Sequence, residues 1–286
     1  MHALRSLGLI VLLAVVQGGA AAQGDPKRGA YLIKAAGCVG CHTEAKKDAT
    51  PYAGGRALKT PFGTFYGPNI TPHPSAGLGR WSEADFVRAM RLGVRPDGAH
   101  YFPAFPYPSF TRIVDADLRD LWAYLRTLPP SARPSQAHDL RFPFGWRFLV
   151  TGWKWLFFSP GVFSADPKQT PPLQRGAYLV EALGHCGECH TARNFLGGPK
   201  RERQLAGTAK GPDGDRIPNL TPARLKKWND GELKGFLQTG LTPDGDVAAE
   251  TMGEVIRNTT AELTPADLAA LIAYLRSLRA IADEPD

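Results

Sequence analysis

Apolar residues recur at helical spacing in the middle of the chain. Four of them fall at positions i, i+3, i+4 and i+7: Leu118, Leu121, Trp122 and Leu125. Side chains at this spacing share one helix face, so the pattern predicts a helix over about residues 116–128 with a buried apolar face. An amphipathic segment over about residues 82–92 predicts another helix, and a first helix is expected to end at the cysteines near residue 40.

The same pattern occurs twice in the chain. Gly-Ala-Tyr-Leu, Cys-x-x-Cys-His, Asn-x-Thr-Pro, Pro-Asp-Gly and Ala-Tyr-Leu-Arg each recur after 147 to 150 residues. The helices recur over about residues 230–239 and 265–278, and Thr264 with Asp267 forms a cap for the last one. Solenoid repeats run about 20–50 residues. The longer period therefore indicates a duplicated domain.

The repeat predicts a mainly α fold with two domains. We place the first domain at residues 23–130, a connector at residues 131–172 and the second domain at residues 173–286. In each copy a few short helices are joined by long Gly/Pro-rich loops. Loops of about thirty residues are unusual in a compact domain unless something else holds them. We therefore expect a bound group inside each domain.

The first 22 residues have the form of a cleaved export signal. Arg5 provides the positive charge, an apolar run spans residues 7–16, and Ala20 to Ala22 form a small-residue cleavage site. The apolar run is shorter than the about 20 residues that a membrane span needs. We therefore expect that residues 1–22 are removed and that the mature protein lies in the periplasm.

Charge and cysteine usage narrow the function classes. The formal net charge is +7 and the Lys and Arg residues are spread along the chain, so we expect no nucleic-acid partner. Four cysteines in an exported protein normally indicate two disulfides, but here each pair reads Cys-x-x-Cys-His. A zinc site would need four ligands close in space, and a thioredoxin-like site would need a βαβ setting. The sequence favours neither.

The doubled Cys-x-x-Cys-His motif predicts two covalently bound haem c groups. Two thiols at this spacing can bond the two vinyl groups of one haem, and the following histidine can coordinate the iron from the proximal side. The predicted attachment residues are Cys38, Cys41, Cys186 and Cys189, and the predicted proximal iron ligands are His42 and His190.

The sixth iron ligand differs between the copies. Met252 follows the second Pro-Asp-Gly turn, and we predict that its thioether ligates the second iron and raises the reduction potential. The matching position in the first copy is Phe105, which cannot ligate iron. We predict His100 as the sixth ligand of the first iron, with an open site or ligation by Tyr101 as alternatives.

The connector is rich in aromatic residues, and two interpretations are open. We favour packing of these rings between the two domains. The alternative is a surface for a membrane or a partner subunit, which Arg147, Lys154 and the tryptophans would suit. The residues concerned are Phe142, Phe144, Trp146, Phe148, Trp153, Trp155, Phe157, Phe158 and Phe163.

Taken with the haem motifs, several segments resemble those of diheme and triheme cytochrome c subunits of bacterial membrane-associated alcohol, aldehyde and gluconate dehydrogenases. The matching features are Gly-Ala-Tyr-Leu, the two Cys-x-x-Cys-His motifs, Asn-Ile-Thr-Pro at 69–72, Pro-Tyr-Pro-Ser-Phe at 106–110, and Met252 with Asn-Thr-Thr at 258–260. The resemblance implies two tandem class I cytochrome c-like domains around covalent haems.

Three departures from this family pattern define what we expect of the chain. We expect neither the third haem domain nor the C-terminal anchor of those subunits, and Phe105 stands where those proteins commonly place a ligating Met. We therefore expect a soluble or loosely attached member, with peripheral membrane association as one alternative.

The function expected from these features is periplasmic electron transfer by a non-catalytic protein or oxidoreductase subunit. The expected donor is a periplasmic dehydrogenase, and the expected acceptor is a quinone, an oxidase or another cytochrome. The alternative is a haem enzyme, such as a peroxidase or small-molecule oxidoreductase, that acts at an open first haem. Phe105 supports that alternative, because it leaves the first iron without a Met ligand.

Overall fold

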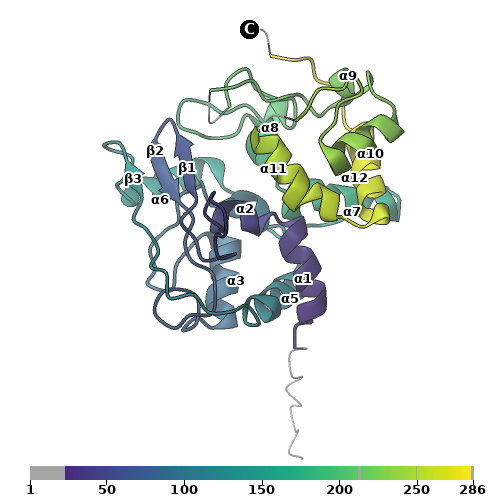
Figure 1. Cartoon of the computed structure of the whole chain (residues 1–286). Helices are drawn as coiled ribbons and strands as arrows, with labels where there is room; N and C mark the ends of the chain where they lie inside the picture. The colour runs from purple at the N-terminus through teal and green to yellow at the C-terminus, as the bar shows by residue number, and fades with distance from the viewer. Residues whose placement is uncertain (1–22, 212–213, 249, 285–286) are drawn as a thin grey trace, which may run out of the picture.

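The computed structural model describes residues 23–211, 214–248 and 250–284, and the predicted export signal lies outside them. The described chain is mainly helical, as the sequence pattern predicts. Figure 1 shows two helical units, with the first at the lower left and the second at the upper right. The connector runs along the first unit before it enters the second.

The first domain combines short helices with a hairpin. Its elements are α1 (Pro26–Ala35), α2 (Cys38–His42), β1 (Ala57–Thr60), β2 (Gly63–Tyr66), α3 (Glu83–Leu92), α4 (Tyr107–Phe110) and α5 (Asp115–Leu125). The connector contributes β3 (Asp139–Leu140) and α6 (Phe148–Phe157). β1, β2 and β3 form an antiparallel sheet in that order, with Gly63 opposite Leu140.

The second domain repeats the helical order of the first. Its elements are α7 (Pro171–Tyr178), the π-helical turn η1 (Leu179–Leu183), α8 (Gly187–His190), the 3₁₀ turn η2 (Arg201–Arg203), α9 (Pro222–Leu225), α10 (Asp230–Thr239), α11 (Glu250–Asn258), the 3₁₀ turn η3 (Thr260–Glu262) and α12 (Pro265–Ser277).

The first and last helices of each domain cross at a glycine. α1 packs against α5, and α7 packs against α12. A Cβ atom at Gly29 would lie 2.0 Å from the carbonyl oxygen of Asp120, and one at Gly176 would lie 2.0 Å from that of Ala270. Only glycine allows two backbones to approach this closely. The repeated Gly-Ala-Tyr-Leu motif therefore marks a helix crossing.

Local capping signals define the helix that follows the long loop of each domain. Ser82 and Asn229 precede α3 and α10, and each forms a capping box with the acidic residue three positions later. Gly93 and Gly240 end the same helices in the left-handed region, at φ values of 59° and 79°. Both helices match their predicted ranges.

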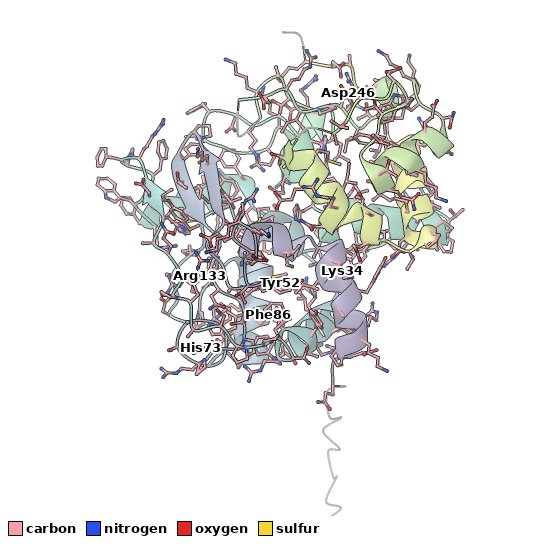
Figure 2. All side chains as sticks on the ribbon, in the orientation of Figure 1. Lys34, Tyr52, His73, Phe86, Arg133 and Asp246 are labelled. Carbon is pink, nitrogen blue, oxygen red and sulfur yellow. The ribbon has the colours of Figure 1, made fainter. Side chains whose placement is uncertain are left out.

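The predicted apolar stripe of α5 lies in the core. Leu118, Leu121, Trp122 and Leu125 are all buried. Tyr52 and Phe86 belong to the same hydrophobic cluster, and Figure 2 shows them inside the first domain, below α2. Phe86 stacks on Trp122 with ring centroids 5.4 Å apart. The core thus joins α3 to α5, while Tyr52 extends it toward the loop after α2.

The aromatic residues of the connector neither all pack between the domains nor all form an exposed surface. Trp153 contacts the second domain, since its Nε1 donates to the carbonyl of Leu196 at 3.1 Å, and Phe163 packs against Tyr178. These contacts are interdomain packing, as predicted. Others of the aromatic side chains are exposed, however, including Trp155 of α6. Among the described residues, no helix is long and apolar enough to cross a membrane.

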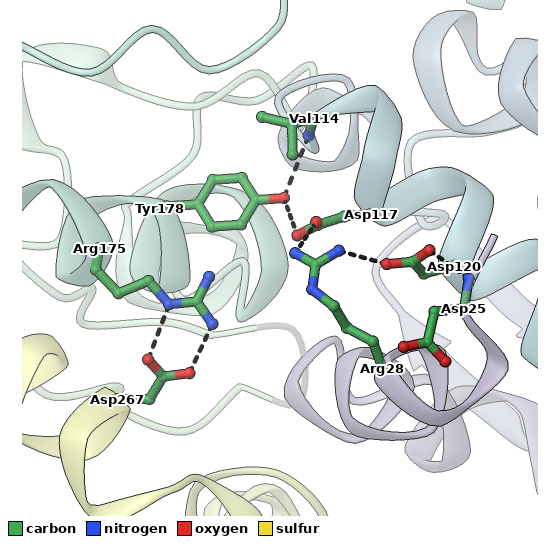
Figure 3. Close-up of polar contacts among 8 residues, drawn as sticks. All are labelled: Asp25, Arg28, Val114, Asp117, Asp120, Arg175, Tyr178 and Asp267. Atoms are coloured by element: carbon green, nitrogen blue, oxygen red, sulfur yellow. Dashed lines mark hydrogen bonds and ion pairs between the residues drawn. The ribbon is translucent and has the colours of Figure 1, made fainter. Parts of the chain in front are cut away.

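A tyrosine of each domain donates a hydrogen bond to an aspartate of the other domain. The Tyr178 hydroxyl of the second domain donates to Oδ2 of Asp117 in the first domain at 2.7 Å, and it accepts the N–H of Val114 (Figure 3). Tyr31 of the first domain makes the equivalent bond to Oδ2 of Asp267 in the second, at 2.5 Å. Since Tyr31 and Tyr178 are equivalent in the repeat, the interface has approximate two-fold symmetry.

An arginine of the same domain also holds each of these aspartates. Arg28 pairs with Asp117 and Asp120 (Figure 3). Arg175 binds Asp267 with both nitrogens of its fork, at 2.8 and 2.6 Å. Each of the two aspartates thus has an arginine of its own domain on one side and a tyrosine hydroxyl of the other domain on the other. A buried carboxylate needs such charged and hydrogen-bonding partners to offset the loss of water.

Candidate functional site

The two Cys-x-x-Cys-His motifs form the short helices α2 and α8. A turn separates α2 from α1, because Gly37 before the motif has φ 62°, in the left-handed region. His185 takes the matching place before α8 with φ 40°, which is uncommon for a residue with a side chain. The first helix, α1, thus ends at Ala35, directly before the motif, close to the predicted end.

His42 and His190 have the tautomer that an iron ligand needs. Nδ1 of His42 lies 2.7 Å from the carbonyl oxygen of Pro68, and Nδ1 of His190 lies 2.7 Å from that of Pro218. A carbonyl only accepts hydrogen bonds, so Nδ1 carries the proton and the lone pair of Nε2 is available. Such bonds orient metal-binding histidines. Burial lowers the pKa of both imidazoles, which favours the neutral form.

Asn69 and Asn219 hold the loops that carry these proline carbonyls. Nδ2 of Asn69 donates to the carbonyl of Ser131 at 2.8 Å, and Oδ1 accepts the N–H of Thr71 at 2.9 Å. Nδ2 of Asn219 donates to the carbonyl of Ile281 at 2.7 Å. Both asparagines are buried. The repeated Asn-x-Thr-Pro motif thus fixes the acceptor of each histidine, a role that its spacing alone did not indicate.

Three of the four motif thiols, those of Cys38, Cys41 and Cys186, have a raised pKa and stay neutral at neutral pH. Burial raises the pKa of Cys38 and of Cys186 to about 12. Burial, with the nearby Cys189 and Glu254, raises the pKa of Cys41 to about 11. A thiol oxidoreductase needs a low-pKa thiolate. The environment of these thiols therefore argues against redox chemistry at sulfur.

Met252, the predicted sixth ligand of the second iron, lies on α11. Its side chain is half-buried and packs against the hydrophobic core. Met90, in contrast, is buried within α3 and is part of that core. Ligation of the second iron by Met252 stays a prediction.

In the first domain, aromatic rings surround the position that matches Met252. Phe105 is half-buried, and its ring centroid lies 5.2 Å from that of Tyr101, 5.8 Å from Phe110 and 6.2 Å from Tyr107. Tyr107 is fully buried, and its hydroxyl has no hydrogen-bond partner among the described residues. This cluster is nonpolar apart from two phenol groups.

His100 is held by a lysine of the connector. Nζ of Lys154 lies 2.8 Å from Nδ1 of His100 and also donates to the carbonyls of Leu92 and Gly93, at 2.6 and 2.9 Å. An ammonium group only donates, so Nδ1 of His100 accepts and its proton is on Nε2. His100 could coordinate iron through Nε2 only if this arrangement changed.

The attachment motifs of the two domains lie close to the domain interface. α2 contacts α11 of the second domain, and α4 of the first contacts η1. Oγ of Ser109 donates to Oε1 of Glu188, inside the second motif, at 2.7 Å. Arg56 pairs with Glu254 of α11 at 2.6 Å. The thiols of Cys41 and Cys189 are near enough to interact electrostatically. The two motifs therefore face each other across the interface.

Two stretches of the chain, residues 26–129 and 173–279, match the family model described as cytochrome c. Together they make up most of the sequence, and each contains one Cys-x-x-Cys-His motif. The chain belongs to the cytochrome c family.

Three relatives show what this cytochrome c is similar to. It is 44% identical to a diheme cytochrome c-type protein of Cereibacter sphaeroides over 90% of this chain and 87% of that one. It is 40% identical to the fructose dehydrogenase cytochrome subunit of Gluconobacter japonicus over 90% of this chain and 53% of that one. It is 36% identical to the gluconate 2-dehydrogenase cytochrome c subunit of Pantoea cypripedii over 89% of this chain and 59% of that one.

The predicted resemblance to the cytochrome c subunits of bacterial dehydrogenases is confirmed. The chain spans little more than half the length of the fructose and gluconate dehydrogenase subunits. It spans most of the diheme protein.

The residues of both cytochrome c domains fit a haem c group. Each has the two cysteines of its Cys-x-x-Cys-His motif and a histidine whose Nε2 is free of the proton. In the first domain, the buried hydroxyl of Tyr107 has no hydrogen-bond partner among the described residues. A buried polar group normally has one, so this hydroxyl is consistent with a bound group that would supply it. The sequence indicated Tyr107 only as part of the Pro-Tyr-Pro-Ser-Phe segment and gave it no role of its own.

Proposed function

We propose that this cytochrome c carries two haem c groups, one in each domain, and transfers electrons in the periplasm. The haem supplies a one-electron couple, and the protein sets its orientation and axial ligands. The chain acts as a subunit or electron acceptor of a dehydrogenase, and the acceptor is a quinone, an oxidase or another cytochrome. Several relatives are cytochrome subunits of dehydrogenases, which supports this kind of donor.

The attachment residues have matched roles in the two domains. Cys38 and Cys41 bond the first haem through thioethers, and Cys186 and Cys189 bond the second. His42 and His190 bind iron through Nε2, and the hydrogen bonds from Nδ1 to Pro68 and Pro218 support this role. Met252 is the sixth ligand in the second domain.

The first domain has a different sixth position. Phe105 stands where the second domain has Met252, and the bond between Lys154 and His100 favours the open-site alternative over ligation by His100. The aromatic rings of Tyr101, Tyr107 and Phe110 surround Phe105 and make this side of the first domain nonpolar. A nonpolar surrounding suits electron transfer better than peroxide chemistry, which needs polar groups to move protons.

The observation that carries the proposal is the position of the two motifs. α2 contacts α11 of the second domain, and Ser109 of α4 donates to Glu188 in α8 at 2.7 Å. The bonds from Tyr31 to Asp267 and from Tyr178 to Asp117 fix the relative orientation of the domains. Two groups held so close in a fixed orientation can exchange electrons without movement of the domains.

A reductive titration of the haem-loaded protein tests the proposal. We expect two one-electron steps, rapid re-oxidation by a soluble quinone or an oxidised c-type cytochrome, and little turnover with hydrogen peroxide. One redox-active haem, or peroxide turnover faster than electron transfer, would instead favour the enzyme alternative.

A further inference from the structure

An apolar surface projects from the connector. We define this connector face by six exposed side chains: Phe142, Trp146, Phe148, Leu149, Trp155 and Leu156. Trp155 is 85% exposed and Phe142 is 79% exposed. Ring contacts link Phe142 to Trp146 and Trp146 to Phe148, with ring centroids 4.9 and 5.6 Å apart. Large exposed apolar patches of this kind mark interaction sites in soluble proteins.

The orientation of α6 explains why these side chains are exposed. Val150 and Lys154, one turn apart, are its buried side chains. Val150 packs on Phe65 and Phe102 in a small cluster beside the three-stranded sheet. Leu149 and Leu156, two turns apart, lie on the opposite side. α6 is therefore attached firmly by one face, and its apolar outer face is left without a partner among the described residues.

Within the connector face itself the nearby charges are positive. From residue 140 to residue 165 the sequence has no acidic residue, although the exposed Asp139 precedes this stretch. Arg141 is exposed, and Arg201 of the second domain lies at the end of α6, where it donates to the carbonyl of Phe157 at 2.9 Å. Exposed cations beside exposed aromatic rings complement an anionic surface that has an apolar layer beneath it.

Two exposed apolar side chains of the second domain, Leu241 and Val247, lack this arrangement. Leu241 and Val247 are exposed beside the Pro-Asp-Gly turn, where Asp244 and Asp246 are also exposed. Single exposed apolar residues are normal on soluble proteins and need no partner. Leu241 and Val247 can therefore serve as a control for exposure alone.

We propose that the connector face docks on the surface of an anionic lipid bilayer. A helix with aromatic and leucine side chains on one face can lie in the interfacial plane, and nearby arginines add attraction to anionic headgroups. Tryptophan suits this position, since one part of its ring is apolar and the N–H is polar. The binding is peripheral and goes beyond the electron-transfer function, because it assigns a location and an orientation.

The docked orientation follows from the contacts of α6. Lys154 joins α6 to His100 and to the end of α3, and Phe158 packs on Tyr107 with ring centroids 5.0 Å apart. The side of the first domain that carries Phe105 and His100 therefore lies close to the bilayer. The second domain reaches α6 through the loop around Leu196 and Arg201.

Co-sedimentation of the haem-loaded protein with lipid vesicles tests this proposal. Binding is measured from haem absorbance with vesicles of phosphatidylcholine alone and with vesicles that contain about 30% phosphatidylglycerol. We expect binding to the anionic vesicles that weakens at high salt. The double variant W155S/L156S should bind at least about tenfold more weakly, while L241S/V247S should bind like the wild type.

The variants also separate lipid docking from other occupants. All four positions are exposed, so the haem spectrum and the circular dichroism of both double variants should stay unchanged. If the wild type fails to bind anionic vesicles, the proposal is wrong. It is also wrong if W155S/L156S binds as tightly as the wild type, or if the substitution instead abolishes self-association or binding to a dehydrogenase while lipid binding persists.

Discussion

At the scale of single residues, the two domains share a proximal side and differ on the distal side. His42 and His190 donate to equivalent proline carbonyls at the same distance of 2.7 Å. Met252 and Phe105 occupy equivalent positions, yet only the thioether can bind iron. The two domains thus share the proximal histidine and differ at the position of the sixth ligand. We therefore expect two haems with different reduction potentials.

Replacement of Met252 tests its predicted role. Met252→Ala should lower the potential of one haem by on the order of 0.2 V, a fraction of the about 0.8 V over which axial ligands set haem potentials. The variant should also lose the Met-to-iron charge-transfer absorption. Potentiometric titration and visible spectroscopy measure both effects. Met90→Leu, within the core of the first domain, is the control and should change neither, and an unchanged Met252→Ala protein would rule out this ligand.

Replacement of His100 tests the first domain. Because Lys154 holds Nδ1 of His100, we expect His100→Ala to leave the spin state of both ferric haems unchanged in electron paramagnetic resonance. The wild type should already bind carbon monoxide at one ferrous haem. Conversion of one haem from low spin to high spin in His100→Ala would show instead that His100 is the sixth ligand.

At the scale of elements, close backbone approach determines the helix pairs. Gly29→Ala brings a methyl group against the carbonyl of Asp120, so it should lower the free energy of unfolding by about 2 kcal/mol. Gly235→Ala in α10 is the matched control, since a Cβ atom there meets nothing within 4 Å. It should raise stability by up to about 1 kcal/mol. Chemical denaturation followed by circular dichroism measures both, and equal effects would contradict the crossing.

The elements that could be predicted from the sequence depend on local signals. α3 and α10 follow from Ser82 and Asn229 at their starts and from glycines at their ends, and the Thr264 cap of α12 is present, with its Oγ accepting the N–H of Asp267 at 3.2 Å. The stripe of α5 follows from its period. These signals depend only on residues within one or two helical turns of each other, so they can be recognised from the sequence alone.

The elements that were not predicted depend on distant partners. β3 pairs with β2 across more than seventy residues, and no local pattern indicates that sheet. Within α6, the environment of each aromatic ring depends on the side of the helix on which it lies: Trp153 donates to Leu196 of the second domain, whereas Phe148 and Trp155 are exposed. Lys154, anchored at α3, sets that orientation. In the candidate site the cysteines and histidines could be identified from spacing, whereas the bond between Lys154 and His100 required the fold.

At the scale of the whole molecule, two ion pairs cross the domain interface at symmetry-related places, and their positive and negative residues are swapped between the domains. Lys34 pairs with Glu262 at 2.6 Å, and Arg112 pairs with Glu181 at 3.3 Å. Glu181 is the equivalent of Lys34 in the repeat, and Glu262 is the equivalent of Arg112. The two pairs are thus related by the approximate two-fold axis with opposite signs. Exposed pairs contribute little free energy, but their charges favour pairing of unlike domains over pairing of like ones.

The central carboxylate of the interface makes stability depend on pH. Burial alone would raise the pKa of Asp267, but hydrogen bonds from Arg175 and Tyr31 outweigh it and hold the pKa below its usual value of 3.8. A lowered pKa adds stability above the usual value, and this is lost as pH falls through the folded value. We therefore expect the free energy of unfolding to fall below about pH 4 less steeply in Asp267→Asn than in the wild type. Parallel pH profiles would contradict this role.

The number of haems per chain tests the two-domain electron-transfer proposal most sharply. Protein matured in a periplasm that attaches haem should be denatured, extracted with acidified acetone and weighed by mass spectrometry. We expect the polypeptide to retain two haem additions, and C38A/C41A and C186A/C189A to retain one each, on the opposite domain. A wild-type chain with a single addition, or with none after extraction, would contradict the assignment of one haem to each domain.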